Sequence, residues 1–138
     1  PGTGGNYSEN SETIPYNKYG WTKLGGECVV HLLYDFCIVR TSFFDPQKIK
    51  HEFYATDKFS SRLPIDYLPK AIAFMLENDF IGVINIGGKK ESDYEKYKRV
   101  KSDIKPCTYE ELVQRSSTRI SRDASMDLSL WNKLRGER

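Results

Sequence analysis

The sequence predicts an α/β fold in which a parallel sheet carries helices and a smaller helical appendage follows. Three observations support this class. Segments with apolar residues at helical spacing alternate with short, apolar, β-branched runs, which is the order of a parallel sheet with crossover helices. From about residue 89 onward the chain becomes polar and is predicted to be helical. A length of 138 residues fits one domain or part of one.

The composition is that of a globular protein and excludes two classes of partner. Hydrophobic residues make up 38% and charged residues 29% of the chain, and no apolar run approaches the roughly 20 residues that a membrane span requires. The formal net charge of +2 is too small for a nucleic-acid footprint. We therefore expect neither a membrane nor a nucleic-acid partner.

The cysteines and the N-terminus bear on where the protein works. Cys28, Cys37 and Cys107 are an odd number without a C-x-x-C motif, which argues against disulfides and favours a reducing, cytoplasmic location. Residues 1–15 have a loop-like composition and lack the basic and apolar regions of a signal peptide. Because the chain opens on Pro1, we expect the complete protein to have an upstream part.

The first predicted helix covers residues 16–34 and leads into a buried strand. Its apolar residues recur at helical spacing and are Leu24, Cys28, Val29, Leu32 and Leu33. Gly25 and Gly26 each destabilise a helix by about 1 kcal/mol relative to alanine, so we expect another backbone to approach them closely. Residues 36–41, FCIVRT, are short, apolar and β-branched and predict the strand.

A second helix and strand follow after an irregular stretch. Beyond a proline that breaks the pattern, residues 47–58 are predicted to hold a short helical segment. Residues 66–79 predict a helix in which Asp66 caps the N-terminus and Pro69 occupies the first turn. The run IGVINIGG, residues 81–88, predicts a second buried strand.

Residues 89–138 are expected to form the small, mainly helical appendage, separate from residues 1–88. Two polar amphipathic helices are predicted, at residues 91–104 and 108–117. The lysine-rich run at residues 95–105 is interpreted as a solvated helix face rather than a phosphate-binding surface, because acidic residues are interleaved with the lysines.

A tyrosine and a lysine stand four residues apart near the start of the first predicted helix. Residues i and i+4 share a helix face, so the side chains of Tyr19 and Lys23 would emerge as neighbours. Reduction of a ketone by hydride needs a proton donor within hydrogen-bond reach of the carbonyl oxygen. A tyrosine can be that donor when a nearby ammonium lowers its ordinary pKa of about 10. The spacing alone also fits an exposed pair on a solvated helix.

Two further groups of side chains are candidates for other sites. Cys28 and His31 form a C-x-x-H that looks like half of a metal site, but no second ligand pair follows at suitable spacing, so we expect no metal. Arg115, Arg119 and Arg122 lie on one predicted loop, and guanidinium groups suit the pyrophosphate of a sugar nucleotide. A charged surface is the alternative interpretation of these arginines.

Five ordered motifs carry a family resemblance across residues 3–131. They are SETIPYNKYGWTKLGGE, FCIVRTSFF, LPIDYLPKAIAFMLE, GVINIGG and SRDASMDLSLWNKL. Together they resemble the extended short-chain dehydrogenases/reductases, and within them the dTDP-4-dehydrorhamnose reductase family. The resemblance implies the C-terminal part of a Rossmann-type parallel sheet with a small helical substrate-binding appendage. Residues 1–88 would belong to the NAD(P)-binding domain and residues 89–138 to the substrate domain.

The resemblance also implies roles for individual residues. Tyr19 would donate the proton, and Lys23 would bind the nicotinamide ribose while tuning Tyr19. Thr41, Ser42 and Phe43 would border the nicotinamide, at the C-terminal end of a strand, where open α/β sheets place ligands.

The implied reaction is the NAD(P)H-dependent reduction of a nucleotide-linked 4-keto-6-deoxysugar, as in dTDP-rhamnose biosynthesis, with Arg119 and Arg122 as substrate-binding candidates. A nucleotide-sugar epimerase or dehydratase on the same scaffold uses the same tyrosine and lysine. A non-catalytic regulatory protein resembling the β subunit of methionine adenosyltransferase is the alternative from another class. In this family the helix at residues 16–34 often packs against a second copy, which implies a homodimer.

The chain departs from the family pattern in three features. The glycine-rich phosphate loop is absent, because neither GTGG nor IGG stands between a strand and a helix. The Ser or Thr of the catalytic triad is also absent, and Asp123 stands where the family usually has proline. We therefore expect NADP or NAD to be bound mainly by an N-terminal half, as an upstream segment or a companion polypeptide. The residue that selects between the two cofactors would lie in that half.

Overall fold

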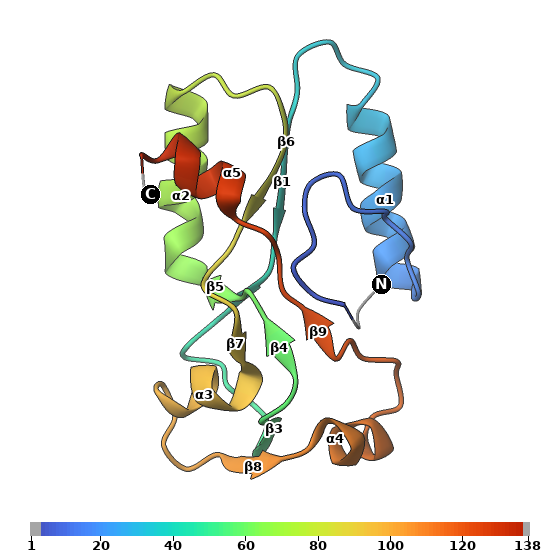
Figure 1. The fold of residues 1–138 in the computed structure, drawn as a ribbon, viewed down its shortest axis with the longest axis vertical. Coiled ribbons are helices and arrows are strands. Elements are labelled where there is room, and N and C mark those ends of the chain that lie inside the picture. The colour runs from blue at the N-terminus through green and yellow to red at the C-terminus, as the bar shows by residue number, and fades with distance from the viewer. Residues whose placement is uncertain (1–3, 137–138) are drawn as a thin grey trace.

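A computed structural model describes residues 4–136 and shows two units along one axis (Figure 1). The sheet unit, in the upper half of Figure 1, contains α1 (Lys18–Val30), β1 (Cys37–Thr41), α2 (Leu68–Glu77), β6 (Gly82–Ile86) and α5 (Ser129–Leu134). The small unit, in the lower half, contains β3 (Phe53–Ala55), β4 (Phe59–Ser60), β7 (Glu91–Ser92), α3 (Asp93–Lys98), β8 (Lys105–Cys107), α4 (Tyr109–Arg115) and β9 (Asp123–Ala124). The pair β2 (Phe43–Phe44) and β5 (Leu63–Pro64) joins the two units.

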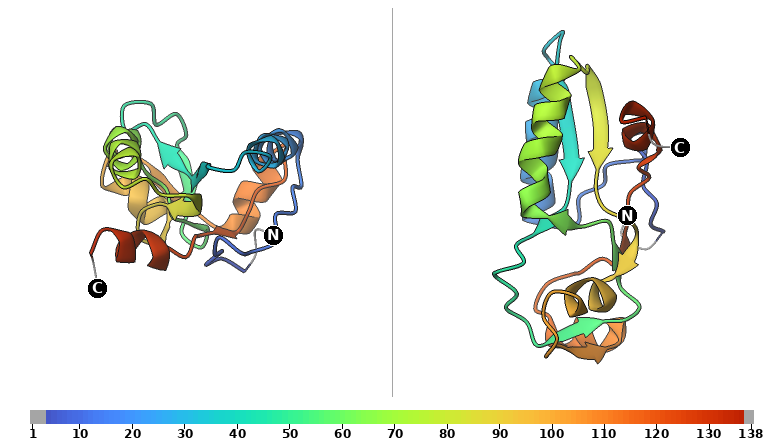
Figure 2. Two further views of the ribbon diagram at one scale, coloured as in Figure 1. Left: turned by 90° about the horizontal axis from the view of Figure 1, so that it is seen from above. Right: turned by 90° about the vertical axis from the view of Figure 1, so that its left-hand side faces the viewer.

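The two predicted strands, β1 and β6, pair in parallel as expected. The register runs from Cys37 opposite Gly82 to Thr41 opposite Ile86. The chain between these strands includes α2, and Figure 2 shows α1 and α2 on one face of the sheet and α5 on the other. Because helices cover both faces, Ile84 and Ile86 are fully buried.

The core of the sheet unit lies where α2, β6 and α5 meet. Its buried members are Leu63, Ala71, Met75, Ile84, Ile86 and Trp131. Trp131 of α5 is 1% exposed, and its ring meets that of Phe74 edge-on with 5.5 Å between the centroids. The apolar face of α2 is only partly buried, since Ile72 and Leu76 are exposed.

The start of α2 corrects one prediction and confirms another. Ile65–Tyr67 forms a 3-10 turn, η1, and α2 follows it at Leu68 without a side-chain cap. Asp66 lies inside that turn rather than at the N-cap position, so its predicted capping role is wrong. Pro69 does lie in the first turn of α2, where the missing N–H breaks no hydrogen bond.

The first predicted helix is present as α1, with tighter bounds and a different environment. The chain at residues 31–34 is not helical. No residue of α1 is buried, so the predicted apolar stripe faces no core in this chain. A Cβ added at Gly25 or Gly26 would meet no atom within 4 Å, so the expected close approach of a backbone is wrong for the part of the chain that the structure describes.

The small unit is built from two segments that are far apart in the sequence. β3 pairs in parallel with β8, with Phe53 opposite Lys105. β4 lies between β7, which is antiparallel to it, and β9, which is parallel. The buried residues Phe44, Tyr54, Tyr97 and Ile104 form the core. The rings of Tyr54 and Tyr97 stack with their centroids 4.4 Å apart.

The helical segment predicted at residues 47–58 is wrong. A turn opens this region, because the N–H groups of Gln47 and Lys48 donate to the Asp45 side chain and carbonyl at 2.9 and 3.0 Å. The chain then extends into β3, whose aromatic residues favour a strand once β8 supplies a partner. Pairing with β8, which lies some fifty positions later in the sequence, therefore outweighs the local helical pattern.

The C-terminal segment holds both predicted helices, α3 and α4, each shorter than expected, together with three short strands. Two of these strands, β7 and β9, pair with β4 from the earlier segment, and α5 returns to pack against β6. We keep the division of the chain into two domains, residues 1–88 and 89–138, as a proposal. The chain passes between the two spatial units on both sides of that boundary.

Candidate functional site

The start of α1 brings Tyr19 and Lys23 together. Asn17 caps the helix, because its Oδ1 accepts the N–H of Gly20 at 2.8 Å. Tyr19 then lies in the first turn, and Lys23 Nζ lies 5.2 Å from the centroid of the Tyr19 ring. The Tyr19 side chain is accessible, with 69% of the residue exposed. A ligand can therefore reach the phenol and the ammonium from the same side.

The carboxyl end of β1 lies at the same end of the sheet unit as the start of α1 (Figure 1). Thr41 is the last residue of β1, and its Oγ1 is buried without a hydrogen-bond partner among residues 4–136. The Ser42 carbonyl accepts the N–H of Leu63 at 3.1 Å, and Phe43 is 49% exposed. Buried hydroxyls are nearly always paired, so Thr41 Oγ1 is an unusual polar atom at the end of β1.

An ion pair that the sequence analysis missed fastens α1 to β1. Arg40 Nε and Nη2 donate to the carboxylate of Glu27 at 3.0 and 2.7 Å, and the two side chains are 22% and 19% exposed. Arg40 Nη1 also donates to the carbonyl of Glu9 at 2.9 Å, and the Glu9 carboxylate accepts the N–H of Asn85 at 2.9 Å. Since α1 buries no side chain, this forked pair helps fix the helix that carries Tyr19.

Replacing Glu27 by glutamine is expected to loosen α1 without unfolding the sheet. The substitution keeps the shape of the side chain but removes the charge, and hydrogen bonds to charged groups contribute about 1.5–3 kcal/mol. Amide hydrogen exchange in α1 should accelerate by about tenfold or more, whereas the amides of β6 keep their protection. Glu77→Gln at an exposed position of α2 is the matched control. Equal exchange of α1 in both variants would contradict this role for Glu27.

The two arginines predicted to bind substrate are both engaged within the chain. Arg122 pairs with Asp57 at 2.8 Å and with Glu110 at 3.3 Å. The Arg119 guanidinium lies over the ring of Tyr16, 5.5 Å from its centroid. The loop that carries both arginines therefore lies beside the residues that precede α1.

A cavity of about 530 Å³ lies in the small unit. Arg115, Arg62 and Lys58 line it, together with the hydroxyl-bearing residues 116–118. Arg119 and Arg122 are not among its lining residues, so the structure separates the three arginines that the sequence placed together.

The lysine-rich segment at residues 95–105 contains a buried cluster, contrary to the solvated face that was predicted. Lys96 is 3% and Tyr97 is 5% exposed. Lys96 Nζ donates to the carbonyl and hydroxyl oxygens of Ser60, both at 3.0 Å, and Arg62 Nη1 donates to the Tyr97 hydroxyl at 3.0 Å. The local pattern hides this burial because Ser60 and Arg62 come from a distant segment.

Burial lowers the pKa of the Lys96 ammonium from 10.5 to about 8. Asp93 and Glu91 oppose this effect, whereas Arg62 and Lys58 add to it by charge repulsion. Between these two pH values the unfolded chain binds a proton at Lys96 that the folded chain has released. The contribution of Lys96 to the free energy of unfolding therefore rises with pH between about 8 and 10.5.

The free energy of unfolding of the wild type, relative to that of a Lys96→Met variant, is expected to rise by up to about 3 kcal/mol between pH 8 and pH 10. Burial raises the pKa values of the thiols Cys37 and Cys107, which act in the opposite direction, so the comparison with the variant isolates Lys96. Urea unfolding at the two pH values measures the difference. Lys98→Met, on the exposed side of α3, is the control. A difference between wild type and Lys96→Met that does not change with pH would refute the prediction.

Metal ligands, membrane-spanning helices and disulfides can each be assessed for the described residues. Within residues 4–136 no group of three His, Cys, Asp or Glu side chains is placed to hold a metal ion. No helix in this range is both long and apolar enough to cross a membrane. All three cysteines are free, with Cys28 and Cys37 exposed and Cys107 buried.

Comparisons with known proteins show which structures share this fold. No family model and no curated protein matches the sequence. A hypothetical dTDP-4-dehydrorhamnose reductase from Sulfolobus tokodaii matches with a TM-score of 0.79 and 27% identity, covering 96% of this chain and 53% of that chain. The dTDP-4-dehydrorhamnose reductase of Bacillus anthracis, in complex with NADP, matches at 0.76 and 19%, covering 96% and 54%. UDP-glucuronic acid 4-epimerase of Bacillus cereus, in complex with NAD, matches at 0.65 and 23%, covering 94% and 49%.

The chain spans about half the length of the solved structures that it matches. These neighbours are reductases and an epimerase, and two of them were solved with a nicotinamide cofactor. The predicted Rossmann-type α/β class is confirmed by their fold. By fold, by the order of its motifs and by its identity to the Sulfolobus tokodaii protein, the chain resembles part of a dTDP-4-dehydrorhamnose reductase.

Proposed function

We propose that the complete protein is an NAD(P)H-dependent reductase of a nucleotide-linked 4-keto-6-deoxysugar, and that this chain supplies its catalytic acid. The observation that carries the proposal is the adjacent, accessible pair of Tyr19 and Lys23 on α1, a helix that begins at the same end of the sheet unit as the carboxyl end of β1. The similarity to the Sulfolobus tokodaii reductase supports the same class of reaction.

The proposed proton transfer uses the two side chains in succession. Tyr19 protonates the carbonyl oxygen of the sugar as hydride reaches the carbonyl carbon. The ammonium of Lys23 stabilises the phenolate that remains, because an opposite charge nearby favours the ionised form. The pair therefore acts as a general acid with an adjacent electrostatic partner.

The end of β1 is proposed to border the nicotinamide. The support for this is the position of Thr41 at the end of β1 and the exposed ring of Phe43, which offers an apolar face beside Ser42. Lys23 is proposed to hold the ribose. The cofactor, NADP or NAD, would supply the hydride when bound.

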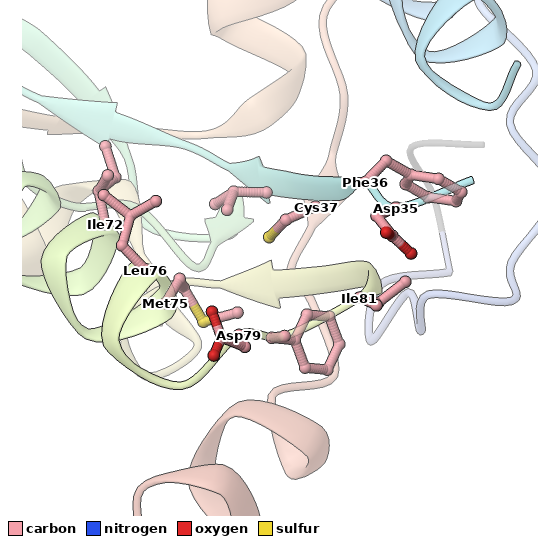
Figure 3. Close-up of a pocket in the computed structure, with 10 residues that line it drawn as sticks. Asp35, Phe36, Cys37, Ile72, Met75, Leu76, Asp79 and Ile81 are labelled. Carbon is pink, nitrogen blue, oxygen red and sulfur yellow. The ribbon is translucent and has the colours of Figure 1, made fainter. Parts of the chain in front are cut away.

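The remaining strands and the phosphate-binding loop are proposed to come from an N-terminal half, as an upstream segment or a companion polypeptide. Within residues 4–136 β1 pairs only with β6. Beside β1 lies a groove of about 550 Å³ that α2 also borders, where Ile72, Leu76 and Ile81 are exposed. Figure 3 shows the residues that line it. Because parallel crossovers are right-handed and α1 lies on the same face as α2, a strand preceding α1 would pair with the free edge of β1.

Two alternatives have specific observations in their favour. The structural match to an epimerase favours a nucleotide-sugar epimerase or dehydratase, which would use the same tyrosine and lysine. The exposed Trp21, Val29 and Leu32 favour a partner surface on α1 and the turn after it. That surface suits a homodimer through residues 16–34, or a non-catalytic regulatory protein like the methionine adenosyltransferase β subunit.

Turnover by the complete protein tests the proposal. Oxidation of NADPH or NADH should depend on added dTDP-4-keto-6-deoxysugar and should yield the reduced sugar nucleotide. Conversion of the sugar without net cofactor oxidation would instead identify an epimerase or dehydratase. Tight binding of a partner enzyme with no conversion would identify the regulatory alternative.

The location of the protein is proposed to be cytoplasmic. The support is the odd number of cysteines, all free in the structure, without a C-x-x-C motif.

A further inference from the structure

The small unit carries a buried cluster of charges that the proposed reaction does not use. Asp93 is its carboxylate, with Lys58 Nζ donating to Oδ2 at 2.6 Å and Ser60 Oγ donating to Oδ1 at 2.9 Å. Lys58 is 9% and Asp93 is 5% exposed, so this pair is largely removed from water. Both oxygens of the carboxylate are thus engaged.

Two further cations of the cluster have no carboxylate of their own. Lys96 donates only to Ser60, and Arg62 donates to the hydroxyl of Tyr97. Within the described residues 4–136, neither has an acidic oxygen within 4 Å. Buried charges are normally paired, and the three cations share the carboxylate of Asp93, while Glu91 acts on Lys96 only from beyond 4 Å, so an excess of positive charge remains.

A pocket of about 320 Å³ opens beside these two unpaired cations. Four cationic side chains, Arg62, Lys89, Lys96 and Arg99, and one acidic side chain, Glu91, line it. Arg99 already donates to Glu91 through Nη1 and Nη2, at 3.0 and 2.5 Å. The apolar part of the lining consists of Phe44, Leu63, Pro64 and Val100.

We propose that this pocket binds a phosphorylated small molecule, whose phosphate is held by Lys96 and Arg62 inside and by Lys89 and Arg99 at the rim. A phosphate carries a charge of about −1.5 to −2 and three acceptor oxygens, which suits several cations that converge from separate segments. A carboxylate would bring a single charge and leave part of the excess uncompensated. The guanidinium forks also match phosphate geometry.

The pocket is distinct from the proposed nicotinamide position. Phe44 lines the pocket, whereas Phe43 does not. Thr41 and Ser42 do not line the pocket either. The phosphate therefore belongs either to the diphosphate of the proposed nucleotide-sugar substrate or to a separate phosphate ester that binds as an effector.

Calorimetric titration of the 138-residue chain with inorganic pyrophosphate and with inorganic phosphate tests the proposal. The double variant Lys89→Gln/Arg99→Gln changes only exposed side chains, so the fold is retained. It is expected to bind the better of the two probes at least about tenfold more weakly, since each lost charged contact contributes roughly 1.5 kcal/mol or more.

The matched control is Lys98→Gln/Lys105→Gln, which removes the same net charge from exposed positions outside the pocket. Its affinity should stay within about twofold of wild type, because distant surface charges are screened. No saturable binding of either probe, or an equal loss in both double variants, would overturn the proposal.

Competition with dTDP distinguishes the two sources of the phosphate. Displacement of the bound probe by dTDP, with an affinity that the Lys89→Gln/Arg99→Gln variant lowers, assigns the pocket to the nucleotide of the substrate. A probe that dTDP leaves in place assigns it to a separate phosphate ester. Because the titration needs neither cofactor nor turnover, its result is independent of whether the reductase proposal holds.

Discussion

Replacing Tyr19 by phenylalanine in the complete protein is expected to lower turnover by about 10²- to 10⁴-fold, the usual contribution of a general acid. The change removes only the phenolic oxygen of a residue that is 69% exposed, so stability and cofactor affinity should change little. Steady-state kinetics with the 4-keto-sugar nucleotide, together with a fluorescence titration of NADPH or NADH, measures the two effects separately.

The matched control for this substitution is Tyr34→Phe. Tyr34 is fully exposed beyond the end of α1, and it loses the same atom at a position with no proposed role. Its turnover should equal that of the wild type. Unchanged turnover in Tyr19→Phe would remove Tyr19 from the reaction, and a fall in kcat shared equally by both variants would point to a general effect of losing a hydroxyl.

Replacing Trp131 by alanine is expected to lower the free energy of unfolding by about 3–5 kcal/mol. The ring is 1% exposed, lies edge-on to Phe74, and also lies under the Arg135 guanidinium, 4.8 Å from the ring centroid. Its loss leaves a cavity between α2, β6 and α5. Since single domains are stable by only about 5–15 kcal/mol, the midpoint of urea unfolding should fall sharply.

Leu130→Ala serves as the control for Trp131. Leu130 precedes the tryptophan on the same short helix but is 36% exposed, so its loss should cost about 1 kcal/mol or less. Equal urea midpoints for the two variants would show that α5 does not stabilise the core of the sheet unit through Trp131.

The features that could be predicted from the sequence are those set by neighbours along the chain. Tyr19 and Lys23 are adjacent because helical geometry alone places them so, and β1 and β6 were visible as short apolar runs. Pro69 fell in the first turn of α2 for the same local reason. These elements carry most of the family resemblance.

The features that could not be predicted depend on partners from distant parts of the chain. Lys96 lies in a polar, lysine-rich run, but it is buried in the structure, where its ammonium donates to Ser60 of a distant segment. Glu27 and Arg40 occupy different elements, and no spacing rule links them. Gly25 and Gly26 are the reverse case, since the close approach of another backbone was expected and residues 4–136 provide none.

The order in which the strands occur along the chain sets when the protein can fold during synthesis. β4 gains its second partner only when β9 has been made, and β3 waits for β8. The core beneath β6 stays open until Trp131 has left the ribosome. Both units therefore close almost together, late in the synthesis of this segment, and a nascent chain stalled shortly before Trp131 would expose an apolar surface to chaperones.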